Sequence, residues 1–98
     1  MKAYPCPCCD YATLPEPTPG TFEICAVCGW EDDDVQCADP ASAGGANTIS
    51  LNQARSSFLA TGRADRASDV PTRNPTFDEV LERAARHAGG RSTVRRGE

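Results

Sequence analysis

Two pairs of cysteines, each with two residues between its members, constrain this chain more than any other feature. Cys6 and Cys9 form the first pair, Cys25 and Cys28 form the second, and fifteen residues separate the pairs. This spacing is typical of sites in which four thiolates hold one zinc ion at about 2.3 Å. The sequence therefore predicts a zinc site with these four ligands, and the same spacing is compatible with iron.

The small size of the chain makes a metal site important for folding. A chain of 98 residues with 39% hydrophobic residues buries only a modest core, and domains of this size commonly need a metal or disulfides. The first residues, MKAYPCPCCD, lack the apolar run of a signal peptide, and no later stretch is apolar enough to span a membrane. We therefore expect a cytoplasmic protein without membrane association, whose thiols stay reduced and bind metal.

Helix signals follow the cysteine-rich segment. Ser50 is a favourable N-cap, Gln53 completes a capping box with it, and Gly62 marks the end of a helix. We expect one apolar face of this helix to pack on the cysteines. Its members are Leu51, Ala54, Phe58 and Leu59.

A second, more polar helix is predicted further along the chain. Thr76 and Glu79 repeat the capping-box pattern. Apolar residues follow at helical spacing, namely Phe77, Val80, Leu81 and Ala84. His87 lies near the expected end of this helix, where a cation suits the helix dipole.

These signals predict a small α+β domain stabilised by metal, in which two zinc-ribbon-like knuckle hairpins precede one or two helices. The expected organisation is a zinc-binding cysteine module with its packed helix at residues 1–62, a linker at 63–75, a C-terminal helix at 76–88 and a disordered tail at 89–98.

Two cysteines exceed the needs of a four-ligand site. Cys8 lies inside the first pair, and we expect an unliganded thiol beside the metal. An alternative is that Cys8 is a reactive thiol, which would make the protein a redox sensor or a thiol enzyme. Cys37 lies in an acidic segment predicted to be a loop, and we expect a free thiol there.

The acidic stretch WEDDD, residues 30–34, has two interpretations. In the first, the tryptophan covers the metal site beside a solvated acidic turn. In the second, Trp30 anchors a docking surface on which Glu31, Asp32 and Asp33 attract a basic protein partner.

Charge is divided unevenly along the chain. Residues 1–50 contain one Lys against eight acidic residues, a net charge of −7, whereas residues 51–98 contain nine Arg against six acidic residues, a net charge of +3. The acidic half disfavours nucleic acid as a partner, although the basic half keeps a nucleic-acid-associated zinc ribbon as an alternative. Nothing places His87 beside a cysteine for catalysis, so we expect a binding module and not an enzyme.

Three segments, CPCCDYATL, FEICAVCGWEDDDVQ and GGANTISLNQARSSF, resemble in this order the bacterial cysteine-rich CPCC family. The resemblance spans roughly residues 4–62 and implies a small intracellular zinc-binding domain, without an established activity. It also implies that Cys8 belongs to the motif. Asp10 departs from the Gly expected after CPCC, and residues beyond 62 match only loosely.

Overall fold

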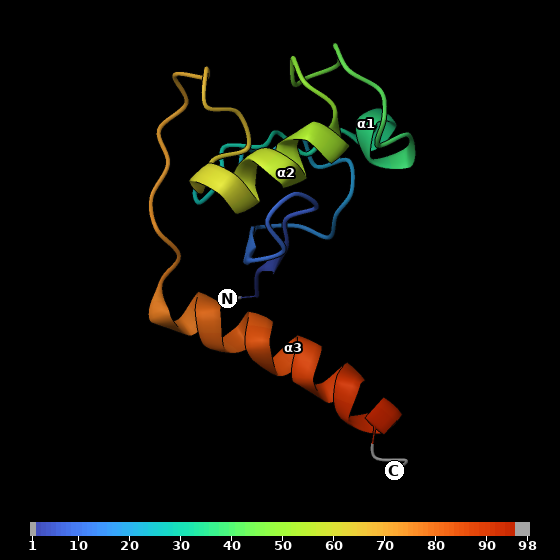
Figure 1. Cartoon of the computed structure of the whole chain (residues 1–98), viewed down its shortest axis with the longest axis vertical. Coiled ribbons are helices and arrows are strands. Elements are labelled where there is room, and N and C mark those ends of the chain that lie inside the picture. Colours follow the sequence, from blue (N-terminus) through green and yellow to red (C-terminus); the bar gives the residue numbers. More distant parts are fainter. Residues whose placement is uncertain (1, 96–98) are drawn as a thin grey trace.

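Two short strands and three helices make up the described part of the chain. The computed structural model describes residues 2–95, and for residues 89–95 only the backbone. The elements are β1 (Tyr4–Pro5), β2 (Ala12–Leu14), α1 (Asp34–Ala38), α2 (Leu51–Thr61) and α3 (Phe77–Arg95). This arrangement confirms a small α+β fold. Figure 1 shows the strands, α1 and α2 gathered in one body, with α3 lying apart from it.

Each cysteine pair lies at the tip of a hairpin. β1 and β2 pair antiparallel around the first pair, with Tyr4 opposite Leu14. The second hairpin is reduced to a single bridge between Ile24 and Glu31, although alternating residues predict a strand over 21–25. The reason is local, because Phe22 has a φ of 57° and interrupts the extended backbone.

The core of the molecule surrounds the cysteines. Trp30, Leu14 and Val27 are among its largest fully buried side chains. α2 closes this core with Leu51 and Ala54, while Phe58 packs edge-on against Tyr11 with ring centroids 6.3 Å apart. The predicted helix therefore packs on the cysteine module.

The prediction for one residue of the apolar face of α2 is wrong. Leu59 is 84% exposed, because it lies about 100° further round the helix than Phe58 and so leaves the buried stripe. The predicted ends are confirmed. Ser50 and Gln53 form the capping box in both directions, and Gly62 ends the helix in the left-handed conformation.

Residues 63–75 contain no helix or strand, yet they are not a free linker. The Ala64 amide donates to the Cys28 carbonyl at 2.8 Å, and the Arg73 amide donates to the Ala26 carbonyl at 3.0 Å. Arg63 also gathers this segment, since its guanidinium donates to the carbonyls of Ser68 and Val70. The segment thus lies against the second hairpin.

α3 begins as predicted, because Thr76 and Glu79 form a capping box. It ends later than predicted. The helix continues from residue 88 to Arg95, so the expected disordered tail is helical over most of its length, and residues 96–98 lie outside the described residues. A helix that has already nucleated extends at little further cost, which explains the difference.

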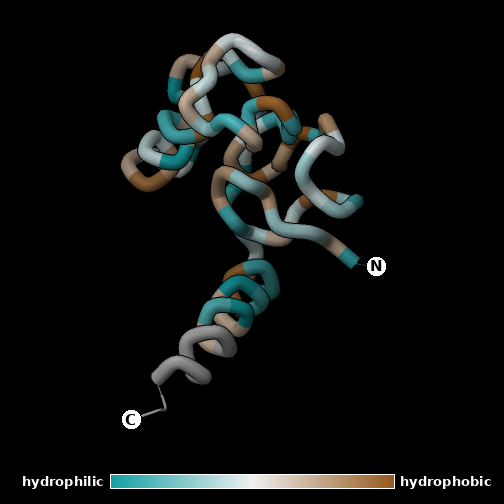
Figure 2. Tube along the Cα trace, turned by 90° about the vertical axis from the view of Figure 1, so that its right-hand side faces the viewer, coloured by the Kyte–Doolittle hydropathy of each residue, from teal (hydrophilic) through white to brown (hydrophobic). Residues whose placement is uncertain are grey.

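α3 meets the module with its charged side. Arg83, Arg86 and His87 face Asp10, whereas the predicted apolar residues point outward and Phe77 is 76% exposed. α2 has already closed the apolar core, so α3 contacts the carboxylate and carbonyl of Asp10 and the ring of Tyr11. Figure 2 shows a mainly hydrophilic α3 set apart from the body, and within residues 2–95 no helix combines the length and apolarity needed to cross a membrane.

Candidate metal centre

The structure brings Cys6, Cys9, Cys25 and Cys28 together, as their spacing predicts. Their four sulfurs all lie within 4.8 Å of one another and all four residues are buried. Cys6 and Cys28 have sulfurs 3.7 Å apart, and Cys9 and Cys25 have the same separation. Four sulfurs at about 2.3 Å from a tetrahedral ion would lie about 3.8 Å apart. The donor set and its spacing therefore fit a zinc or iron ion.

The two knuckles that hold the sulfurs have the same backbone design. In the first, the Cys8 amide donates to the Cys6 sulfur at 3.4 Å and the Asp10 amide donates to the Cys6 carbonyl at 2.8 Å. In the second, the Val27 amide and the Gly29 amide make the equivalent bonds to Cys25 at 3.4 and 2.8 Å.

Both knuckles end in a left-handed residue. Asp10 has a φ of 68° and Gly29 a φ of 88°. An aspartate enters this region at a smaller cost than most residues, so the departure from Gly leaves the turn intact. Asp10 also brings a carboxylate to the edge of the centre, which a Gly would not.

A further polar contact comes from Thr13, which sequence reasoning missed. Its hydroxyl donates to the Cys25 sulfur at 3.0 Å, and the Trp30 amide donates to the Cys28 sulfur at 3.5 Å. Hydrogen bonds of this kind orient thiolate ligands and stabilise their negative charge. The only sequence signal was the position of Thr13 in the strand that follows the first knuckle.

The sulfurs share protons when no cation neutralises them. Hydrogen bonding with Cys28, Cys6 and Cys9 lowers the pKa of Cys25. Hydrogen bonding with Cys25 is the main cause that raises the pKa of the other three thiols. A divalent ion that binds here must displace these protons, so metal binding will release protons to the solvent.

The acidic stretch that follows the second knuckle is mostly buried, which contradicts the predicted docking surface. Trp30 is 1% exposed, Asp32 is 0% exposed and Asp33 is 6% exposed, while Glu31 is half-buried. The carboxylates serve the fold, since Asp32 accepts from the Thr21 amide at 2.9 Å and Asp33 caps α1. α1 itself was expected to be loop.

A side-chain latch made of Gln36 and Asn47 connects the knuckle to the loop before α2. The fully buried Gln36 amide donates to the carbonyls of Ser42, Asn47 and Ile49. Asn47 pairs with both backbone groups of Glu31, at 2.9 and 2.8 Å. Neither latch residue was predicted, because their partners lie far away in the sequence.

Gly45 allows the loop to approach this latch closely. A Cβ atom at Gly45 would lie 2.6 Å from a carboxylate oxygen of Asp33 and 3.0 Å from the Gln36 side chain. That oxygen accepts from the Ala46 amide at 2.9 Å. A side chain at position 45 would collide with Asp33 and Gln36, which explains the glycine at this position of the segment.

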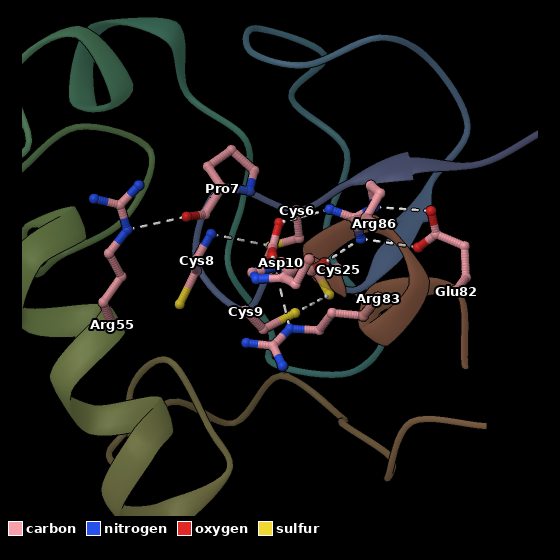
Figure 3. A network of polar contacts seen from close by, with 11 residues as sticks. Cys6, Pro7, Cys8, Cys9, Asp10, Cys25, Arg55, Glu82, Arg83 and Arg86 are labelled. Atoms are coloured by element: carbon pink, nitrogen blue, oxygen red, sulfur yellow. Dashed lines mark hydrogen bonds and ion pairs between the residues drawn. The ribbon is translucent and has the colours of Figure 1, made fainter. Parts of the chain in front are cut away.

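Cys8 and Cys37 lie outside the four-sulfur cluster. Cys8 is 8% exposed and belongs to the core, while Cys37 is half-buried in the last turn of α1. Figure 3 shows the Cys8 sulfur directed away from the sulfurs of Cys9 and Cys25. Both are free thiols, so the structure holds two sulfurs that the candidate metal centre does not use.

The comparisons with known proteins agree with this site. The sequence pattern of a family described as cysteine-rich CPCC matches residues 4–79, which include both knuckles, the latch and α2. No curated protein matches the chain. Since the match covers most of its 98 residues, the chain belongs to the cysteine-rich CPCC family.

Proposed function

We propose that the protein is a small zinc-binding module in which one Zn²⁺, held by Cys6, Cys9, Cys25 and Cys28, has a structural role. The observation that carries this proposal is the four-sulfur cluster with tetrahedral spacing. All four positions are thiolates inside the core, whereas catalytic zinc sites keep one position for water or substrate. This supports a zinc-ribbon-like binding module and not an enzyme.

Elemental analysis of the protein purified without added metal tests the proposal. We expect one zinc per chain, together with loss of metal in Cys25→Ser and retention in Cys37→Ser. Iron in the same cage would give a coloured protein and an iron signal, and would correct the choice of ion. A preparation with neither metal and with six freely titratable thiols would overturn the proposal.

We further propose that the module acts by binding a protein with a basic surface. Its first fifty residues have a net charge of −7, and Glu23 and Asp34 are among the acids that stay exposed. Arg83 and Arg86 are occupied by Asp10, which disfavours nucleic acid as the partner. Thiols outside the cage persist best in a reducing compartment, so we place the protein in the cytoplasm.

A pull-down from a lysate at increasing salt tests the partner. We expect capture that weakens with salt and that is lost in a Glu23→Lys, Asp34→Lys double variant. Asp69→Lys, in the segment after α2, is the control for added positive charge. Capture that the double variant leaves unchanged would overturn this part of the proposal.

A further inference from the structure

Cys8 and Cys37, the two cysteines outside the metal centre, line the same hollow of the surface. The hollow has a volume of about 450 Å³, and its wall also includes Pro7, Thr18 and Arg55. Cys8 comes from the tip of the first knuckle and Cys37 from the last turn of α1. The fold thus brings two thiols that are distant in the sequence to one solvent-connected space.

Arg55, from α2, lies in the wall of this hollow and contacts the first knuckle. Its Nε donates to the Pro7 carbonyl at 3.0 Å, which holds α2 beside the first knuckle. Figure 3 shows this contact next to Cys8, whose sulfur points away from the sulfurs of Cys9 and Cys25. The Arg55 charge also acts on Cys37, where it opposes burial and Asp32, the two causes that raise the pKa of this thiol.

We propose that Cys8 and Cys37 form a dithiol site that a hydroperoxide oxidises to an intramolecular disulfide, while the four cage cysteines stay unoxidised. The cage cysteines are 0 to 2% exposed, and the sulfurs of Cys6, Cys25 and Cys28 accept backbone hydrogen bonds. Cys37 is half-buried and therefore the most accessible thiol of the six. We therefore expect peroxide to react first with the accessible thiol of Cys37 and not with the buried cage cysteines.

The reaction proceeds in two balanced steps. The Cys37 thiolate attacks the terminal peroxide oxygen and the O–O bond breaks. The leaving alkoxide, or hydroxide when the oxidant is hydrogen peroxide, takes the proton that the thiol gave up and leaves as an alcohol or water. The Cys8 thiol then attacks the sulfur of the resulting sulfenic acid, the S–O bond breaks, and the hydroxyl leaves with the thiol proton as water as the S–S bond forms. Two thiols lose two electrons, and these reduce the peroxide.

Formation of the bond requires a small closure of the hollow. Within the described residues no hydrogen bond joins the two sulfurs, and a disulfide needs Cα atoms about 4.4–6.8 Å apart. Because Gln36 holds α1 in the latch, this closure is a local change at the Cys37 and Cys8 side chains. The reaction is therefore slow compared with that of a preformed pair.

Peptide mapping of the full chain, purified with its metal, tests the proposal. The metal content is measured first, which separates a failure of the proposed zinc site from a failure of the thiol pair. After hydrogen peroxide and alkylation, we expect a Cys8–Cys37 cross-link, a mass about 2 Da lower, and unchanged metal content. Cys8→Ser should instead accumulate a sulfenic acid on Cys37 that dimedone traps.

Arg55→Gln provides a graded variant. Loss of the positive charge should slow the reaction roughly two- to fivefold without changing the link, whereas Arg66→Gln, exposed in the segment after α2, should have no effect. The proposal is overturned if peroxide releases the metal and links cage cysteines while Cys8 and Cys37 remain alkylable. A Cys37–Cys37 link between two molecules, removed by dilution, would overturn it equally.

Discussion

The cysteine module and α3 are held in the molecule by opposite kinds of contact. The module buries sulfurs, Trp30 and Leu51 in a continuous core and satisfies its buried amides through the latch. α3 instead meets the module through ion pairs to Asp10 and turns Phe77 to solvent. Partly exposed ion pairs contribute about 0–1 kcal/mol each. The stability of the chain therefore resides in the module, and α3 depends on surface electrostatics.

Removal of the metal should destabilise the cysteine module more than any other change. Thiolate ligation supplies on the order of 10 kcal/mol, which matches the whole stability of a small domain. We expect a chelator, or Cys25→Ser, to unfold the hairpins and α2, because α2 then loses the surface on which it packs. Circular dichroism during chelator titration measures the loss.

Cys37→Ser is the matched control, since it removes a thiol from the module without removing a ligand. Its melting midpoint should stay close to that of the parent chain. Unchanged helix content after complete metal removal would show that the core, and not the cluster, stabilises the module.

Asn47→Ala should have the next largest effect. It leaves the backbone amide and carbonyl of Glu31 without their partner and removes a donor to Gln36. We expect a loss of about 2–4 kcal/mol in the free energy of unfolding. Asn52→Ala, on the exposed side of α2, should stay within about 0.5 kcal/mol in the same urea titration. Equal losses in both variants would contradict the latch.

The two capping boxes offer a direct test of the difference between α2 and α3. Ser50→Ala should lower the free energy of unfolding by about 1 kcal/mol, because α2 belongs to the cooperative core. Thr76→Ala removes the same kind of cap, yet it should reduce helix content in α3 and leave the midpoint of the module unchanged. Hydrogen exchange resolves the two regions, and a global shift in both variants would show that α3 folds with the module.

The smallest effect is expected at the anchor of α3. Asp10→Gly keeps the left-handed turn of the knuckle, because glycine accepts a φ of 68°, but removes the carboxylate that faces Arg83, Arg86 and His87. α3 should bind the module more weakly, because only the bond from Arg86 to the carbonyl of residue 10 and the Arg83–Tyr11 contact remain, while the metal stays bound. The Tyr11 ring signals in NMR report the change, since the Arg83 guanidinium lies 5.0 Å from that ring. Asp69→Gly, outside the anchor, should leave these signals in place.

Acid should act on the same anchor. Burial acts to raise the pKa of Asp10, but hydrogen bonds from His87 and Arg86 outweigh it and lower the pKa. A lowered pKa in the docked state means that this contribution is present above the ordinary value of 3.8 and is lost as the pH falls below it. The Tyr11 signals should then shift toward those of Asp10→Gly, and no shift down to pH 2 would contradict the assignment.

Short-range patterns in the sequence predicted the parts of the fold that short-range physics decides. The ligand pairs and both capping boxes depend on residues three positions apart. The burial of Asp32 and the Gln36–Asn47 latch could not be predicted, because they need partners from other segments. Helical periodicity identified the apolar side of α3 but not which side meets the module. The side of α3 that contacts the module is decided by Asp10, which lies at the end of the first knuckle and pairs with the arginines of α3.

The position of Asp10 has a consequence for metal affinity. Its backbone conformation is set by the knuckle that begins at Cys6, and its carboxylate receives α3. If a bound ion favours the docked helix by some factor, thermodynamic reciprocity requires that the docked helix favour the bound ion by the same factor. Under that condition, a helix that supplies no ligand would change how tightly the cage retains its ion, but only by the small free energy of one partly exposed ion pair, which leaves the metal bound when α3 is lost.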